Sequence, residues 1–217
     1  MDSTALHPAR PAPAWLRPAL LDRIEQGVIA LLWVWMVERV AVSTFRDGNH
    51  LAWLVLLSET AVMVFTVIRR PTEAISMNLG DWLLAVTATA APMLIEPARN
   101  PLAFVGMAGV GLVVVGNIGQ AAAKLALARS FGIAPANRGI KVAGPYRLVR
   151  HPMYAGYLLV HIGVLLIMPL PINLVIYAVG WTAQIRRILA EEALLGQDPA
   201  YRAYMGAVRW RLVPGLF

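Results

Sequence analysis

The chain has 217 residues, of which 59% are hydrophobic and 14% are charged, and its formal net charge is +7. A mean hydropathy of +0.62 is too high for an ordinary soluble domain of this length and predicts an integral membrane protein. The sequence contains no cysteine, which excludes a disulfide, a thiolate nucleophile and a thiolate metal site. The basic residues are dispersed without a recognisable binding motif, so nucleic acid is not an expected partner.

The N-terminal stretch, residues 1–20, is rich in proline and alanine. Its prolines interrupt the apolar stretch that a cleavable signal peptide needs, so we expect the first apolar segment to remain as an anchor. We interpret residues 1–20 as a flexible cytoplasmic lead. Residues 21–217 should form one membrane domain, because they contain no convincing repeat and no sharp boundary.

Apolar segments long enough to span, or nearly span, about 30 Å of hydrocarbon follow one another along the chain. They lie at 24–45, 50–68, 79–95, 101–123, 154–168 and 172–189. The last two flank Pro169-Leu170-Pro171, which predicts a tight helical hairpin that packs against other helices. The expected fold is all-α: a polytopic membrane helical bundle of about six membrane segments, with a C-terminal cytoplasmic helical cap. Glycines of the fourth segment, among them Gly109 and Gly116, indicate close contact with another helix.

The distribution of basic residues predicts the orientation. With both termini in the cytoplasm, all Lys and Arg except Arg39, Arg46 and Arg99 fall on the inner side, as the positive-inside rule expects. Basic residues near the inner leaflet are also attracted to anionic lipid headgroups, which accounts for the high charge. We expect a multi-pass protein with membrane lipids as partners, in a bacterial inner membrane.

The run from Gly144 to Gly156 brings titratable, cationic and aromatic side chains to the start of an apolar segment. Because Pro152 restricts the residue before it and suits the first turn of a helix, His151 should lie where a helix begins. His151 could act as a general base, donate a hydrogen bond to a ligand or be an ordinary loop residue. Tyr146 and Tyr154 could line a cofactor pocket or belong to an interfacial aromatic belt.

A second polar group follows the last apolar segment. Arg187 and Glu191 are four residues apart and share a helix face, whereas Glu192 points about 100° away. The pair could be an ordinary ion pair at a solvated helix end. The pair is predicted to lie on the same side of the membrane as His151, which favours a binding site instead. A carboxylate there can bind an ammonium or a ribose hydroxyl. Residues 124–217 should therefore contain the site.

Two ionisable residues fall within apolar segments, where burial is costly. His161 is interpreted as pocket lining, and Glu59 as a member of a structural pair. A metal site is not expected, because the histidines and carboxylates lack a ligand spacing such as His-Glu-x-x-His.

The sequence resembles the family that unites isoprenylcysteine carboxyl methyltransferases with membrane phospholipid N-methyltransferases. The likeness rests on Gly144-Pro145-Tyr146, on the run from Arg150 to Gly156, on Arg187 with Glu191-Glu192, and then on Gly196, Tyr201, Tyr204, Val208, Arg211 and Pro214. It covers the C-terminal part of the chain. The preceding apolar segments match only as generic membrane helices.

The resemblance implies that the chain binds S-adenosyl-L-methionine. The cofactor-binding candidates that it implies are Ile140, Tyr146, His151, Pro152, Met153, Tyr154 and Glu191. It places Arg187 on the side of the methyl acceptor, and Arg187 and Glu192 are the catalytic candidates. Ile140 belongs to Arg138-Gly139-Ile140-Lys141, which stands where eukaryotic members commonly carry a His-x-Leu-Val run.

We therefore expect an enzyme that transfers a methyl group to a lipid-like or amphiphilic acceptor. A carboxylate acceptor needs no general base, whereas an amine or thiol could lose its proton to His151, Glu191 or Glu192. One alternative is a sterol or steroid reductase that uses NADPH, although Met153 and Tyr157 replace residues typical of those families. The other alternative is a lipid-binding membrane protein without catalytic activity.

Overall fold

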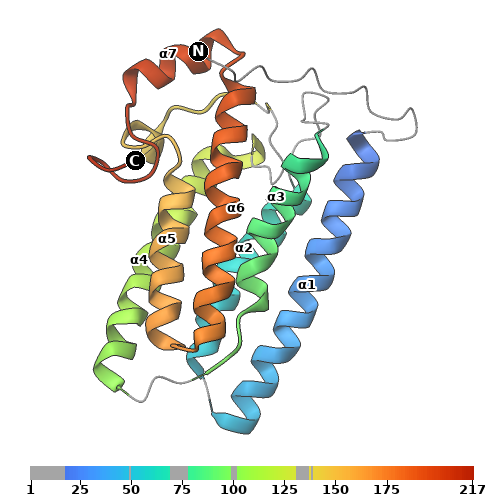
Figure 1. The fold of residues 1–217 in the computed structure, drawn as a ribbon, viewed down its shortest axis with the longest axis vertical. Coiled ribbons are helices and arrows are strands. Elements are labelled where there is room, and N and C mark those ends of the chain that lie inside the picture. The colour runs from blue at the N-terminus through green and yellow to red at the C-terminus, as the bar shows by residue number, and fades with distance from the viewer. Residues whose placement is uncertain (1–17, 49, 69–77, 99–101, 131–136, 138) are drawn as a thin grey trace, which may run out of the picture.

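The computed structural model describes residues 18–48, 50–68, 78–98, 102–130, 137 and 139–217. Within these ranges the regular elements are helices and no strand occurs, which confirms the all-α prediction. The α-helices are α1 (Pro18–Asp47), α2 (Trp53–Ile68), α3 (Leu79–Ala90), α4 (Ala103–Leu127), α5 (Pro152–Ile167), α6 (Pro171–Leu195) and α7 (Pro199–Ala207). Short 3-10 helices are η1 (His50–Ala52), η2 (Ala91–Leu94), η3 (Ala128–Ser130) and η4 (Gly144–Arg147). Figure 1 shows α1 to α6 side by side in a bundle, with α7 at one end.

Each predicted apolar segment coincides with one of the helices α1 to α6. Within the described residues, two of these are by themselves long and apolar enough to cross a membrane, Arg23–Asp47 and Phe104–Leu127. The others are shorter or carry more polar residues. The helical segments are thus confirmed, whereas crossing of the membrane by all six remains a prediction.

Helices α4 and α5 approach each other through two glycine pairs. A Cβ atom added to Gly109 would lie 2.6 Å from the carbonyl oxygen of Gly163, and one added to Gly116 would lie 2.8 Å from that of Gly156. The pairs are seven residues apart on both helices, so they repeat along one face of each helix. This contact confirms the close packing predicted for the fourth segment and identifies α5 as the partner.

The hairpin of α5 and α6 turns tightly at Met168–Leu170, but large side chains separate its two helices. The rings of His161 and Tyr177 stack with centroids 4.4 Å apart, and Trp181 Nε1 donates to His161 Nδ1 over 3.0 Å. On its other side, α6 packs closely on η2, where a Cβ at Gly180 would lie 2.8 Å from the Cβ of Ala91. The separation leaves room for a cavity between α2, α3, α5 and α6.

The C-terminal cap consists of α7 and an irregular tail. Asp198 caps α7 by accepting a hydrogen bond of 2.8 Å from the backbone N–H of Ala200. The tail then returns to the start of α5, where the N–H of Arg150 donates to the carbonyl of Trp210 and the N–H of His151 donates to that of Arg211, both over 2.8 Å. The backbone of His151 is therefore fixed by residues far away in the sequence.

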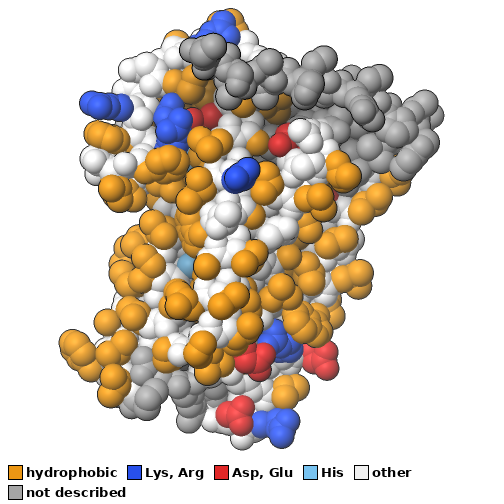
Figure 2. Space-filling model, in the orientation of Figure 1, with side chains coloured by type: hydrophobic (Ala, Val, Ile, Leu, Met, Phe, Trp, Pro, Cys, Tyr) orange, Lys and Arg blue, Asp and Glu red, His pale blue; other side chains and the backbone are white. Residues whose placement is uncertain are grey.

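The outside of the bundle is largely apolar. Hydrophobic side chains cover the middle of the face seen in Figure 2, and charged side chains gather mainly towards its two ends. Among the exposed residues, Phe45 and Phe104 each keep 86% of their surface accessible. Soluble monomers rarely expose apolar areas of such extent, so this surface is suited to contact with lipid.

Candidate active site

A cavity lies between the end of the bundle and the C-terminal cap, and we call it the cap cavity. Its open volume is about 690 Å³, which is in the range of small-molecule sites. Its walls come from the end of α4, the segment before α5, the first turn of α5, the end of α6, and α7. They include six of the predicted cofactor residues: Ile140, Tyr146, His151, Met153, Tyr154 and Glu191.

The seventh, Pro152, is not part of the cavity wall. It is buried in the first turn of α5, directly after His151, which is the N-cap residue. Because proline pre-sets the backbone of a first helical turn, Pro152 supports the position of His151 and need not touch a ligand itself.

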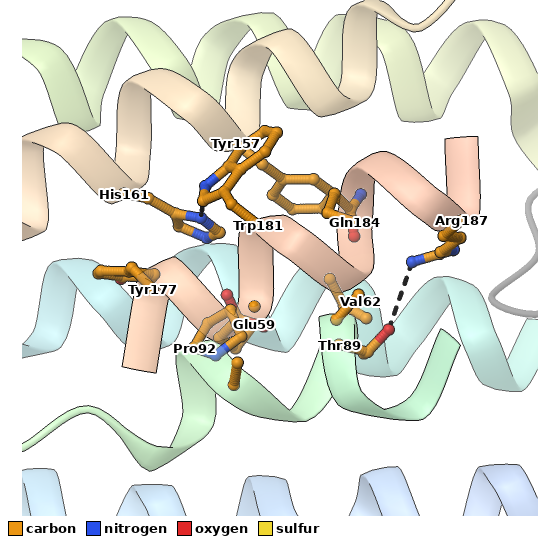
Figure 3. Close-up of a pocket in the computed structure, with 13 residues that line it drawn as sticks. Glu59, Val62, Thr89, Pro92, Tyr157, His161, Tyr177, Trp181, Gln184 and Arg187 are labelled. Atoms are coloured by element: carbon orange, nitrogen blue, oxygen red, sulfur yellow. Dashed lines mark hydrogen bonds between the residues drawn. The ribbon is translucent and has the colours of Figure 1, made fainter. Parts of the chain in front are cut away.

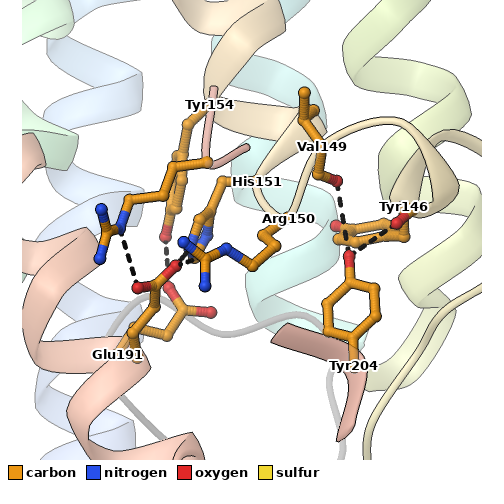
Figure 4. A network of polar contacts seen from close by, with 9 residues as sticks. Tyr146, Val149, Arg150, His151, Tyr154, Glu191 and Tyr204 are labelled. Atoms are coloured by element: carbon orange, nitrogen blue, oxygen red, sulfur yellow. Dashed lines mark hydrogen bonds and ion pairs between the residues drawn. The ribbon is translucent and has the colours of Figure 1, made fainter. Parts of the chain in front are cut away.

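Glu192 is held by three basic side chains. Its Oε1 lies 3.0 Å from His151 Nε2 and 3.2 Å from Arg150 Nε, and its Oε2 accepts a hydrogen bond of 2.9 Å from Arg211 Nε. Figure 4 shows the polar network of this region, with Arg150, His151 and Glu191 labelled. Burial raises the pKa of Glu192, but the hydrogen bonds and charges of His151, Arg211 and Arg150 outweigh that effect and leave the pKa below its ordinary value.

An ionised Glu192 makes His151 the donor at Nε2. This leaves Nδ1 as the ring nitrogen through which a neutral His151 can accept a hydrogen bond from a ligand. Glu192 itself does not line the cap cavity, although the sequence suggested it as a catalytic residue. The geometry favours a positioning role for Glu192, and its proposed part in proton transfer stays a prediction.

Glu191 faces the cap cavity, one residue before Glu192. Its Oε2 accepts a hydrogen bond of 2.9 Å from the hydroxyl of Tyr154. The ring of Tyr154 in turn stacks on His151, with centroids 5.5 Å apart. A carboxylate, a phenol and an imidazole therefore meet at one wall of the cavity.

Tyr204 of α7 fastens the loop that carries the site. Its hydroxyl donates to the backbone carbonyl of Tyr146 over 2.7 Å and also lies 3.4 Å from that of Val149. Burial raises the pKa of Tyr204 to about 12. The charge of Arg150 opposes this shift and that of Glu192 adds to it. The hydroxyl therefore stays protonated, and a donor, at neutral pH.

A second cavity lies inside the bundle, between α2, α3, α5 and α6, and we call it the bundle cavity (Figure 3). Its wall is mostly apolar and includes His161, as the sequence predicted, and also Glu59. Arg187 stands at one end of it, where its side chain is 4% exposed and Nη1 lies 3.4 Å from Thr89 Oγ1.

Tyr154 and Arg187 form the wall between the two cavities. Tyr154 lines the cap cavity and Arg187 lines the bundle cavity, and the guanidinium carbon of Arg187 lies 5.2 Å from the centroid of the Tyr154 ring. Arg187 and Glu191, predicted to share a helix face, thus meet the same tyrosine from α6. The two cavities therefore lie next to each other at this pair of side chains.

Sequence reasoning assigned no cofactor role to several residues of the cap cavity, including Lys141, Arg150 and Tyr201. Arg150 and Tyr201 belong to the motifs on which the family resemblance rests, so the sequence offered that signal for them. The polar residues Tyr177, Trp181 and Gln184 of the bundle cavity were also missed. Their spacing of four and three residues puts them on one face of α6, a signal that is also typical of ordinary helix packing.

Comparison with known proteins bears directly on these residues. The phospholipid methyltransferase family matches residues 102–198, from the start of α4 to the end of α6. Protein-S-isoprenylcysteine O-methyltransferase A of Arabidopsis thaliana is 30% identical over 183 residues, which cover 82% of this chain and 85% of the plant protein. All of the candidate site residues, from Ile140 to Glu192, fall within residues 102–198.

These matches define a membrane methyltransferase, and the apolar helical bundle agrees with that class. The chain belongs to the family that unites isoprenylcysteine carboxyl methyltransferases with phospholipid methyltransferases, as its motifs indicated. This membership favours methyl transfer over the reductase alternative.

Proposed function

We propose that the protein binds S-adenosyl-L-methionine in the cap cavity and transfers its methyl group to an amphiphilic acceptor in the bundle cavity. The observation that carries this proposal is the single wall of Tyr154 and Arg187 between the two cavities. A polar cofactor can arrive from the aqueous end, and an acceptor with an apolar body can arrive from lipid.

The side chains of the cap cavity suit the chemical groups of this cofactor. Glu191 can accept hydrogen bonds from its ammonium or ribose hydroxyls, and Lys141 can pair with its carboxylate. The rings of Tyr146 and Tyr154 offer π faces to a sulfonium cation and adenine. When bound, S-adenosyl-L-methionine supplies a methyl group whose bond to sulfur breaks as the acceptor atom bonds to the methyl carbon.

The chain's own contribution is alignment and exclusion of water. Holding an acceptor against the wall of Tyr154 and Arg187 replaces a bimolecular encounter with an oriented one, and the buried surroundings keep water away. Arg187 is a strong donor for an anionic head, so we favour a carboxylate as the acceptor group. The matching plant protein is named as an O-methyltransferase, which agrees with an oxygen acceptor.

A carboxylate acceptor needs no general base. If the acceptor is instead a protonated amine or a thiol, Glu191 and the Nδ1 atom of His151 are the groups at the cap cavity that can take its proton. Glu192 is less suited, because its oxygens are already bound by His151, Arg150 and Arg211.

We also propose that the six apolar segments at 24–45, 50–68, 79–95, 101–123, 154–168 and 172–189 lie in the membrane, with both termini on the cytoplasmic side. Residues 1–20 are proposed as a lead, of which Pro18 to Leu20 already belong to α1. The apolar belt around the bundle and the bias of basic residues support this arrangement. Residues 1–17 lie outside the described residues, so the structural part of this proposal concerns the described ranges from residue 18 onward.

The first experiment is calorimetric titration of the detergent-purified protein with S-adenosyl-L-methionine and, separately, with NADPH. The His151→Ala variant should lose most of the cofactor affinity, whereas His50→Ala, an exposed histidine in η1, should keep it. Transfer of a labelled methyl group into lipid extracts would then establish turnover. Binding of NADPH alone would overturn the proposal in favour of a reductase, and cofactor binding without transfer to any lipid would favour a non-catalytic lipid-binding protein.

A further inference from the structure

The bundle cavity contains buried polar atoms that its apolar surroundings do not satisfy. His161 Nε2, the Tyr177 hydroxyl and Gln184 Nε2 have no hydrogen-bond partner among the described residues. All three residues line this cavity, and their exposures are 8%, 3% and 6%. Buried polar groups are normally paired, so three such atoms around one space indicate a polar group of a bound molecule.

The hydrogen bond between Trp181 and His161 decides which partner His161 requires. An indole N–H can only donate, so His161 Nδ1 must be the acceptor in their contact of 3.0 Å. A neutral His161 then carries its proton on Nε2, the atom without a partner. Gln184 Nε2 is likewise a donor, and the hydroxyl of Tyr177 can donate as well. The missing partner is therefore a hydrogen-bond acceptor.

The charges nearby favour a neutral acceptor over an anion. Glu59 lines the same cavity and is 2% exposed, so a second negative charge beside it would be repelled. Lys124 interacts electrostatically with Glu59, and its Nζ donates a hydrogen bond of 2.9 Å to Gln120 Oε1. A buried anion needs an opposite charge, whereas a carbonyl oxygen needs only the neutral donors present here.

Two of these donors, His161 and Tyr177, lie away from the reacting end, whereas Gln184 precedes Arg187 by only three residues on α6. His161 follows Tyr154 by seven residues on α5, a distance of about 10 Å along the helix. Tyr177 precedes Arg187 by ten residues on α6, or about 15 Å. Figure 3 shows His161 and Tyr177 at one end of the cavity and Arg187 at the other. An elongated molecule can thus meet polar side chains at both ends.

We propose that the acceptor molecule carries a second, neutral oxygen, of the carbonyl type, within its apolar body, and that His161 and Tyr177 bind it. This inference rests on the proposed function, which puts the reacting group of the acceptor at Arg187. A plain hydrocarbon tail would leave His161 Nε2 and the Tyr177 hydroxyl unsatisfied, so these two residues determine specificity for an oxygen-bearing chain.

The test compares octadecanoic acid with oxo-octadecanoic acids that carry the ketone at successive carbons. Binding to the detergent-purified protein is measured by calorimetry without cofactor. Isomers whose ketone lies about 10 Å from the carboxylate should gain one hydrogen bond. They should therefore bind roughly 3- to 10-fold more tightly than octadecanoic acid. Tyr177→Phe and His161→Phe should abolish this preference and keep the affinity for octadecanoic acid. Thr182→Val, on an exposed position of α6, should keep the preference.

Equal binding of octadecanoic acid and every oxo isomer by the unaltered protein would overturn the inference, whatever the variants do. It would mean that bound water satisfies His161 and Tyr177. The outcome is separable from the proposed function: labelled-methyl transfer into lipid extracts without a ketone preference defeats only the inference. A ketone preference without any binding of S-adenosyl-L-methionine defeats only the function.

Discussion

The hydroxyl of Tyr154 donates a hydrogen bond of 2.9 Å to the carboxylate of Glu191. This bond joins the first turn of α5 to the end of α6 at the wall between the two cavities. It orients Glu191 towards the cap cavity and holds the ring of Tyr154 beneath Arg187. The same tyrosine therefore positions the residues proposed for the cofactor and for the acceptor.

Replacing Glu191 by Gln should weaken binding of S-adenosyl-L-methionine by about 10- to 100-fold, because a charged hydrogen bond to the ligand becomes a neutral one. The protein should still fold, since the amide oxygen can accept the bond from Tyr154. Calorimetric titration measures the affinity, and Glu38→Gln, at an exposed position of α1, is the matched control. Unchanged affinity would refute the assignment of Glu191 to the cofactor.

Arg187→Lys should separate binding from catalysis. Lysine keeps the charge but loses the planar guanidinium that contacts Thr89 and Tyr154, so the methyl-transfer rate should fall at least about 10-fold. Cofactor affinity should change little, because Arg187 lines the other cavity.

The control for this change is Arg186→Lys, because Arg186 precedes Arg187 on α6 and is exposed. Labelled-methyl transfer into lipid extracts provides the rates of both variants. A loss of cofactor affinity equal to the loss of rate in Arg187→Lys would instead assign Arg187 to the cofactor site.

The network around Glu192 should make the stability of the protein decrease at acidic pH. The pKa of its carboxyl is lowered in the folded protein from the ordinary value of 4.5. Its contribution is therefore fully present above pH 4.5 and is lost as the pH falls through the lower folded-state value. Thermal unfolding in detergent at a series of pH values between neutral and acidic measures this loss.

Glu192→Gln should reduce stability at neutral pH by about 1 to 3 kcal/mol, since Arg150 and Arg211 lose a charged partner. The variant should also lose the part of the acid dependence that Glu192 causes. If its unfolding temperature matched that of the unaltered protein at every pH, the ion pairs would contribute nothing to docking of the C-terminal tail.

The glycine contact between α4 and α5 allows a matched comparison on one helix. Gly109→Ala would put a methyl group 2.6 Å from the carbonyl of Gly163, which should destabilise the protein by about 1 to 3 kcal/mol. Gly111→Ala meets nothing within 4 Å and should be neutral or slightly stabilising. Thermal unfolding of both variants decides the point, and equal stability would mean that α4 and α5 are not in close contact.

Sequence patterns located the helices, and six of the candidate cofactor residues line one cavity. The apolar segments coincide with α1 to α6, and His151 begins α5 where Pro152 indicated. These features depend on local rules, since proline geometry and runs of apolar residues act within a few positions of the chain. Composition and motifs likewise pointed to a membrane methyltransferase, and the comparisons support that class.

Only the tertiary structure decided the roles of neighbouring residues. Helical periodicity separates Glu191 from Glu192 by about 100°, but it cannot tell which of them meets a cavity. That choice depends on the C-terminal tail, which brings Arg211 onto Glu192, and on Tyr154, which meets Glu191. The sequence by itself determined where helices form and which polar residues lie near the cap. The packing of distant segments decided the two cavities and the wall between them, because such contacts depend on side chains far apart in the chain.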